Sequence, residues 1–281
     1  MKKPHFRYNV LAAHAAILSP RDNMNNTLQV ILRRRSLRVY ADQPLQPLHR
    51  NAILQAALRA PTAGNMMLYS IIEVTDQALK DQLAVTCDNQ PFLAKAPLVL
   101  LFLADYQRWE DYYTACGVDE LCALKGMQRR HPQEGDLFLA CCDALIAAQT
   151  AVLAADALGL GSCYIGDIME QYQVHKDLLG LPQYVFPVCM LVFGYPTQQQ
   201  IDRPFTPRFD EKFIVFKNRY RQLSRDEFTE MFAERQSRLP AGWVKEGVTT
   251  VGQATYLRKF SADFSVELRR SVREWLKQWA E

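Results

Sequence analysis

Apolar residues along the chain follow two patterns, one typical of helices and the other typical of strands. Apolar positions spaced three or four residues apart, together with capping signals, predict helices over residues 27–35, 47–59, 76–86, 136–158, 171–179, 225–236 and 264–279. Short unbroken apolar runs predict strands over residues 69–74, 98–104, 161–165, 188–194 and 213–216. Pro47 suits the first turn of its helix, and Pro61 ends that helix.

The segment 136–158 is the longest helical pattern in the chain. It is rich in leucine and alanine and leaves few polar faces. A helix that is apolar almost all round is buried on most sides. It therefore needs packing partners all round, and a second subunit is one source of them.

The order of the predicted elements indicates an α+β fold. Strands and helices are mixed without the steady alternation of a doubly wound parallel sheet. We therefore expect a mixed sheet flanked by helices. The length of 281 residues allows one elaborated domain or two small ones. Residues 1–24 are interpreted as an N-terminal extension, because His14 interrupts the apolar run that a signal peptide needs.

Charge and composition disfavour several classes of function. The net charge of +3 is too small to indicate a nucleic-acid or membrane partner, and no apolar run approaches the roughly 20 residues that span a bilayer. The seven cysteines include no Cys-x-x-Cys pair, which favours free thiols in a cytoplasmic protein. A metal site built from Cys116, Cys122 and Cys141 would have a spacing that matches no familiar pattern, and the histidines are scattered. We expect no metal.

A basic cluster at positions 33–38 is the first candidate for binding chemistry. Four arginines surround Ser36 there, and fixed cations beside a hydroxyl can hold a phosphate. Two alternatives stay open, because cations at the end of a helix are favoured by the helix dipole and a nucleic-acid patch is also basic. The four arginines exceed what a dipole needs, and no aromatic residues are interleaved with them. We favour a phosphate.

The segment 60–65 follows one predicted helix later and contains small residues and one amide. Such a loop lets a planar ring lie close to the backbone. A phosphate clamp and a flat-ring loop together indicate a nucleotide-like cofactor.

The glycine-rich segment 159–166 is not a dinucleotide-binding motif. Its spacing is not G-x-G-x-x-G, and it follows a helix and precedes a strand, the reverse of the required order. We expect Gly159 and Gly161 to end the preceding helix. Gly166 can open the backbone toward a ligand.

Aromatic and acidic residues are concentrated in the segment 105–113, which includes Trp109, Tyr112 and Tyr113. The segment fits a pocket for flat substrates, and it fits a half-buried amphipathic helix equally well. The chain has no nucleophile elbow and no P-loop.

Taken together, four segments resemble motifs of the nitroreductase family of FMN-dependent oxidoreductases, in the family's order. They are Arg34-Arg35-Ser36-Leu37-Arg38-Val39-Tyr40, Ala60-Pro61-Thr62-Ala63-Gly64-Asn65, Asn89-Gln90 ahead of Ala96-Pro97, and Gly159-Leu160-Gly161-Ser162-Cys163-Tyr164-Ile165-Gly166. The resemblance spans about residues 27–210. It implies a nitroreductase-like core over residues 25–210 and a C-terminal extension over residues 211–281 that wraps the partner subunit.

The resemblance also assigns cofactor contacts to individual positions. The FMN-binding residues it implies are Arg34, Arg35, Ser36, Arg38, Pro61, Thr62, Ala63, Asn65, Met67, Gln90, Ile165, Gly166, Asp167 and Arg208. The arginines and Ser36 would hold the phosphate, Gln90 would meet the pyrimidine edge of the ring, and the backbone of 165–167 would face N5 and O4. Thr62 and Asn65 would reach the flavin from the partner subunit. Many family members have glutamine where this chain has Met67, which removes one polar contact.

The activity implied is the transfer of two electrons from NAD(P)H through FMN to an electron-poor acceptor such as a nitroaromatic, a quinone or a flavin. No side chain needs to act as acid or base, because the flavin carries the chemistry. The resemblance further implies a homodimer, with Trp109, Tyr112 and Tyr113 near the substrate. Two rivals are a flavin-binding redox sensor or FMN store with little turnover, and a nucleic-acid-binding module built on the basic cluster.

Overall fold

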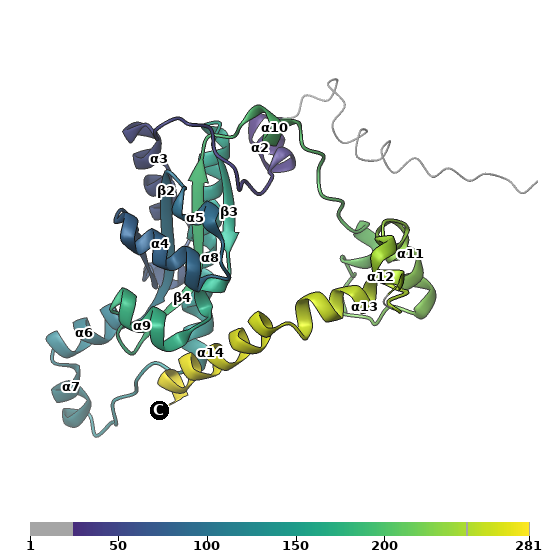
Figure 1. The fold of residues 1–281 in the computed structure, drawn as a ribbon. Coiled ribbons are helices and arrows are strands. Elements are labelled where there is room, and N and C mark those ends of the chain that lie inside the picture. Colours follow the sequence, from purple (N-terminus) through teal and green to yellow (C-terminus); the bar gives the residue numbers. More distant parts are fainter. Residues whose placement is uncertain (1–24, 246, 281) are drawn as a thin grey trace, which may run out of the picture.

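A four-stranded sheet forms the centre of the molecule, in the order β1-β2-β4-β3 (Figure 1). The computed structural model describes residues 25–245 and 247–280. The strands are β1 (Tyr69–Glu73), β2 (Leu98–Asp105), β3 (Gly161–Ile165) and β4 (Val185–Gly194). Every residue of β2 and β4 is buried, as their unbroken apolar runs predict.

The described sheet is antiparallel and not mixed, which corrects the expectation from the sequence. Each hydrogen-bonded pair of strands runs antiparallel. Two helical pieces lie between β1 and β2, namely α4 (Gln77–Thr86) and α5 (Pro91–Ala94), and two lie between β3 and β4, namely η2 (Asp167–Met169) and α9 (Tyr172–Leu179). Each of these connections reverses the overall direction of the chain, so the strands that it joins run antiparallel. β4 separates β2 from β3.

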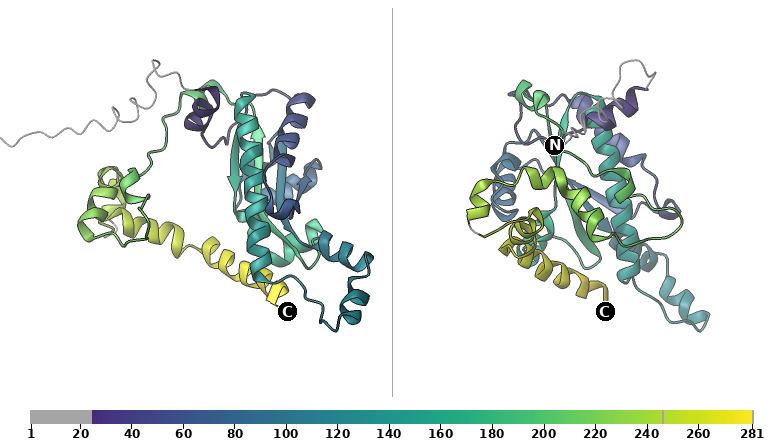
Figure 2. Two further views of the ribbon diagram at one scale, coloured as in Figure 1. Left: turned by 180° about the vertical axis from the view of Figure 1, so that it is seen from behind. Right: turned by 90° about the vertical axis from the view of Figure 1, so that its right-hand side faces the viewer.

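The long helix α8 (Glu134–Ala157) packs along one face of the sheet, beside α3 (Pro47–Leu58) (Figure 2). Its inward face consists largely of alanines, which let the helix approach the strands closely. Those buried alanines are Ala140, Ala144, Ala147, Ala148, Ala151 and Ala155. In length and mean hydropathy the helix could cross a membrane, but its contacts with all four strands make it a core helix.

The opposite face of α8 differs from the expectation of burial on most sides. Phe138, Leu139, Leu145 and Ile146 are all exposed, between 40% and 67%. A single chain therefore covers only one side of this helix.

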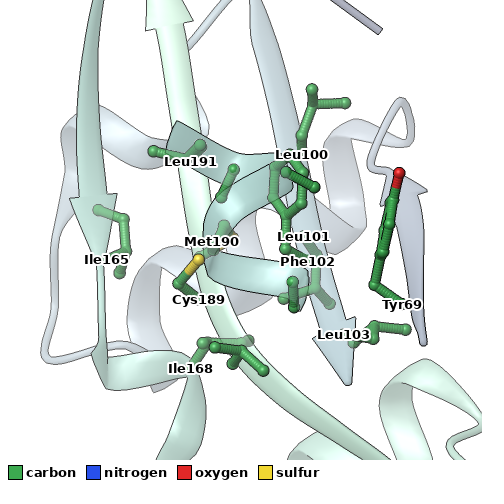
Figure 3. Packing of buried hydrophobic residues seen from close by; sticks show 14 of the residues in the cluster. Tyr69, Leu100, Leu101, Phe102, Leu103, Ile165, Ile168, Cys189, Met190 and Leu191 are labelled. Carbon is green, nitrogen blue, oxygen red and sulfur yellow. The ribbon is translucent and has the colours of Figure 1, made fainter. Parts of the chain in front are cut away.

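The core is continuous across the sheet. Figure 3 shows Leu101 and Phe102 of β2 beside Met190 of β4, with Ile165 of β3 and Tyr69 of β1 at the two edges. These side chains come from all four strands, so the core fixes the relative positions of both sheet edges.

The N-terminal part of the described chain lies against the β3 edge. Helix α2 (Asn26–Arg33) begins where the Asn25 side chain accepts a hydrogen bond from the Thr27 amide, and it ends before the basic cluster is complete. The next residues are extended. Ser36 forms an isolated parallel bridge with Ser162, and the Leu37 amide donates to the Ser162 carbonyl at 2.8 Å.

Beyond β4 the chain forms an arm, residues 203–245 and 247–262, that stands away from the sheet (Figures 1 and 2). After α10 (Gln198–Asp202), the helical elements of the arm are η3 (Glu211–Phe213), α11 (Arg225–Ser237), α12 (Ala241–Lys245), α13 (Val251–Thr255) and η4 (Tyr256–Phe260). The predicted strand at 213–216 is wrong. Asp210 caps a helical turn there, and Ile214 and Val215 are exposed with no described strand beside them.

The last helix, α14 (Asp263–Ala280), brings the chain back to its own core. Trp275 and Trp279 are fully buried. The Trp275 ring meets Tyr172 edge-on at 4.6 Å between centroids, and Trp279 meets Tyr184 at 5.4 Å. Such aromatic pairs add to the large apolar area that indole rings remove from water, so the arm is anchored at both ends.

Candidate functional site

A cavity of about 740 Å³ lies between the basic cluster and the segment that follows β4. Its charged and hydroxyl-bearing lining includes Arg34, Arg35, Ser36, Arg38, Arg203 and Arg208. All the predicted phosphate contacts therefore line one space. Sequence reasoning missed Arg203, whose Nη2 donates to the Ser36 carbonyl at 2.7 Å across 167 residues of chain. In the sequence, a role for Arg203 is indicated by its place in the same proline-rich stretch as Arg208.

Two arginines that line this cavity have side-chain donors without a hydrogen-bond partner in the described part of the chain. Arg34 Nη1 and Arg35 Nε are buried and have no hydrogen-bond partner there, and the Arg35 guanidinium stacks on Phe205 at 3.8 Å. Buried donors on cations are costly to leave unpaired. A phosphate would satisfy them with charge-assisted hydrogen bonds, so the residues present fit the phosphate end of FMN.

The helix dipole explains only part of the cluster. Arg33 is the basic residue in the last turn of α2. The later arginines lie beyond the helix, on the extended segment along β3. That placement favours a ligand over the purely structural alternative.

Gly161 makes room for this extended segment. A Cβ at Gly161 would lie 2.9 Å from Leu37 Cβ, closer than such atoms approach in proteins. Gly159, with φ +78°, is the residue that ends α8, and the Leu160 amide closes the turn on the Ala155 carbonyl at 2.9 Å. The expectation that Gly161 also ends the helix is wrong, because Gly161 already belongs to β3.

The predicted flavin loop precedes β1 and includes η1 (Ala63–Asn65). Asn65 and Met67 have left-handed backbone angles, with φ of 57° and 51°. The Thr62 hydroxyl donates to Asp143 of α8 and accepts from the Met67 amide at 2.8 Å. The Thr62 side chain is thus engaged both with its own loop and with α8. Asp143 was missed by sequence reasoning, although an acid in the middle of an apolar helix is a signal.

Gln90 and Asp167, which are 77 residues apart in sequence, meet beyond the end of β3. Gln90 Nε2 donates to Asp167 Oδ2 and to the Cys87 carbonyl, both at 2.8 Å. The two amide hydrogens are therefore used, and the carbonyl end of Gln90 is the end suited to accept from a ring N–H. Ile165 and Gly166 immediately precede Asp167, so these predicted contacts are brought together.

Glu170 lies next to this group and is 4% exposed. Burial, followed by the negative charges of Asp167, Asp88 and Glu267, raises the pKa of Glu170 to about 7. A buried carboxyl beside other acids holds its proton near neutral pH.

The aromatic segment forms α6 (Gln107–Ala115), which projects from the core with α7 (Val118–Leu124). Trp109 Nε1 donates to the Met66 carbonyl at 2.9 Å, and the Trp109 ring contacts Tyr112 and Tyr113. Tyr113 also lines a cavity of about 640 Å³ with Glu110 and His131. The helix is half-buried, and its aromatic cluster is attached to the flavin loop.

Two parts of the predicted site stay apart in one chain. The arginines lie along β3, whereas the loop 60–67 leads into β1. β1 and β3 are opposite edges of the sheet. Within a single subunit the predicted phosphate contacts and the predicted flavin loop therefore belong to opposite edges of the sheet.

Comparison with known proteins adds an independent observation, because a model of the Nitroreductase family matches residues 31–195. The chain belongs to the nitroreductase family. The chain is 31% identical over 207 residues to an FMN reductase (NADPH) of Bacillus subtilis, covering 73% of this chain and 78% of that protein. It is also 31% identical over 206 residues to an NADPH-flavin oxidoreductase of Vibrio harveyi, with the same coverage.

Solved structures agree with this membership. The NADPH:FMN oxidoreductase of Vibrio harveyi complexed with NAD+ superposes with a TM-score of 0.72 at 25% identity, over 90% of this chain and 98% of that one. NfrA2 of Bacillus megaterium superposes with a TM-score of 0.72 at 26% identity, over 92% and 99%. The resemblance carried by four short segments and the α+β fold class are both confirmed.

Replacing Gly161 by alanine is expected to weaken FMN binding, because the new Cβ would push Leu37 and the adjoining Ser36 off the β3 edge. Gly135 offers a matched control, since a Cβ added there would meet no described atom within 4 Å. We expect G161A to raise the FMN dissociation constant about tenfold or more, and G135A to leave it nearly unchanged. Fluorescence titration of the apoprotein measures both. Equal affinities would contradict this role of Gly161.

Replacing Glu170 by glutamine is expected to stabilise the protein in a pH-dependent way. The raised pKa means that the folded chain holds this proton more tightly than the unfolded chain, so the stability it contributes is full below the ordinary pKa of 4.5 and is lost as pH rises through 7. Glutamine mimics the protonated form. E170Q should gain about 1–3 kcal/mol at about pH 8 and little at about pH 5 in denaturant unfolding. A gain that does not vary with pH would disprove the assignment.

Proposed function

We propose that this chain is an FMN-dependent oxidoreductase that passes two electrons from NAD(P)H to an electron-poor acceptor. The observation that carries the proposal is the arginine-lined cavity, whose buried donors lack partners in the described chain. Family membership and the names of the relatives, FMN reductase and NADPH-flavin oxidoreductase, support it. The acceptor class is a nitroaromatic, a quinone or a free flavin.

Each group of residues has a distinct task in this proposal. Arg34, Arg38 and Arg203 line the cavity and hold the phosphate. The carbonyl oxygen of Gln90 accepts from the ring, because Asp167 fixes the orientation of its amide. FMN held by these residues would supply the redox chemistry, the transfer of two electrons from NAD(P)H to the acceptor.

We further propose that the functional unit is a homodimer. The two halves of the site lie at opposite sheet edges, so a second copy is needed to bring a flavin loop to a phosphate cavity. The exposed apolar stripe of α8, which includes Leu145 and Ile146, supports a contact between copies. The arm carries further exposed apolar residues, Phe228 and Phe260 among them, that can wrap the partner. The free state of all seven cysteines supports a cytoplasmic location.

The first test is the visible absorbance spectrum of the purified protein, with release and identification of its chromophore. Arg34→Gln should weaken FMN binding about tenfold to a hundredfold, because it removes charge-assisted hydrogen bonds. Arg33→Gln is the matched control: it removes the same charge one residue away, outside the cavity lining.

Turnover separates an enzyme from a flavin store or sensor. Stopped-flow oxidation of NAD(P)H with a quinone should be fast for the wild type and slow for R34Q at limiting FMN. A colourless protein that takes up no added FMN would refute the cofactor assignment. A flavin-containing protein without turnover would favour the store or sensor.

The dimer is tested on the exposed face of α8. Leu145→Asp should shift the protein to monomer, because it places a charge in the apolar contact, and the monomer should lose FMN. Leu124→Asp on α7, at a residue that is 85% exposed, is the control and should leave the dimer intact. Sedimentation velocity with detection at the flavin absorbance measures both properties. A monomeric wild type that retains FMN would contradict the proposal.

A further inference from the structure

Asp143 is an acidic residue in the middle of the most apolar helix of the described chain. Its side chain is 2% exposed, and it forms no ion pair within the described residues, although buried charges are usually paired. A carboxylate in such a place is costly unless hydrogen bonds satisfy it. What satisfies Asp143 lies outside α8, in the predicted flavin loop.

Both oxygens of this carboxylate accept hydrogen bonds from the loop. Oδ1 accepts from the Ala63 amide at 3.0 Å, and Oδ2 accepts from the Leu68 amide at 3.1 Å and from the Thr62 hydroxyl. The Thr62 hydroxyl also accepts from the Met67 amide at 2.8 Å, so the Thr62 side chain connects the two ends of the loop. Each of these partners of Asp143 is a donor, so the position calls for a group that only accepts.

The loop held in this way has an unfavourable backbone. Asn65 and Met67 are non-glycine residues in left-handed conformations, with φ of 57° and 51°. Such conformations persist only where the surroundings fix them. Asp143 fixes the loop from a helix that packs on all four strands. The position of the loop is therefore fixed relative to the core.

The loop in turn holds the aromatic cluster of α6, since Trp109 Nε1 donates to the Met66 carbonyl. A shift of the loop would therefore move both the surface next to the flavin ring and the aromatic side chains beside it.

We propose that Asp143 is a positioning residue for the flavin site: it sets the backbone of residues 62–67 against the isoalloxazine ring and, through Met66, places Trp109. This inference rests on the proposed FMN-dependent function. Asp143 itself touches neither cofactor nor substrate in this arrangement.

The test compares Asp143→Asn with the wild-type holoenzyme. Asparagine keeps the shape but turns an N–H₂ group toward an amide or hydroxyl donor, so the loop must move. We expect about a tenfold or larger rise in the FMN dissociation constant and a changed visible circular dichroism spectrum of the flavin that remains bound. The KM for a quinone acceptor should rise more than kcat falls.

Two further variants keep the result decisive. Val152→Ala, at a buried residue nine positions further along the same helix, controls for lost stability; it should lower the unfolding midpoint and leave the flavin spectrum unchanged. Thr62→Val removes one of the three donors and should give a smaller spectral change in the same direction, which also serves if D143N fails to fold.

The outcomes separate the inference from the function on which it rests. A wild type that binds no FMN overturns both. A wild type with normal FMN binding and turnover, together with D143N or T62V variants whose flavin spectrum and KM match those of V152A, overturns the positioning role alone. Spectral and KM changes in D143N that V152A lacks support it.

Discussion

The close packing of α8 on the sheet is the constraint from which the other features of the molecule follow. Alanines on the inward face bring the helix near the strands, and this proximity lets Asp143 reach the loop before β1. The same helix leads directly into β3. There Gly161 leaves room for Leu37, so the basic segment that contains Leu37 can lie against the strand. One helix thus locates both sheet edges on which the site is built.

Buried polar groups occur at several places in the described chain, and four of them bear on the proposed site. Most charged side chains in the described chain are exposed or paired with opposite charges. The exceptions include buried donors on Arg34 and Arg35, and the buried carboxyls of Asp143 and Glu170. Each of these four lies in or beside a segment that the family resemblance assigns to the cofactor. A buried donor without a partner is costly for folding, and the unpaired donors of Arg34 and Arg35 are in the lining of the cavity proposed for the phosphate.

The sequence predicts most helices and strands correctly, because their apolar periodicity is local. The residues that it proposes for the phosphate line one cavity, because Arg34 and Arg38 lie in one short motif. Prediction from the sequence fails at 213–216, where an apolar run without a neighbouring strand in the described chain begins at the end of η3 and continues without regular structure. It also misses Arg203 and Asp143. Their partners lie 167 and 81 residues away along the chain, so only tertiary packing gives them their roles.

The anchoring of α14 has a consequence for assembly kinetics. The arm leaves the core after α10 and returns through Trp275 and Trp279, so it forms a loop that is closed on its own subunit (Figure 1). If the proposed dimer places its partner subunit inside that loop, the partner can leave only when both indole rings unpack. The rate of subunit exchange would then be set by how fast α14 detaches from the core of its own subunit. A dimer of modest affinity would therefore still exchange its subunits slowly.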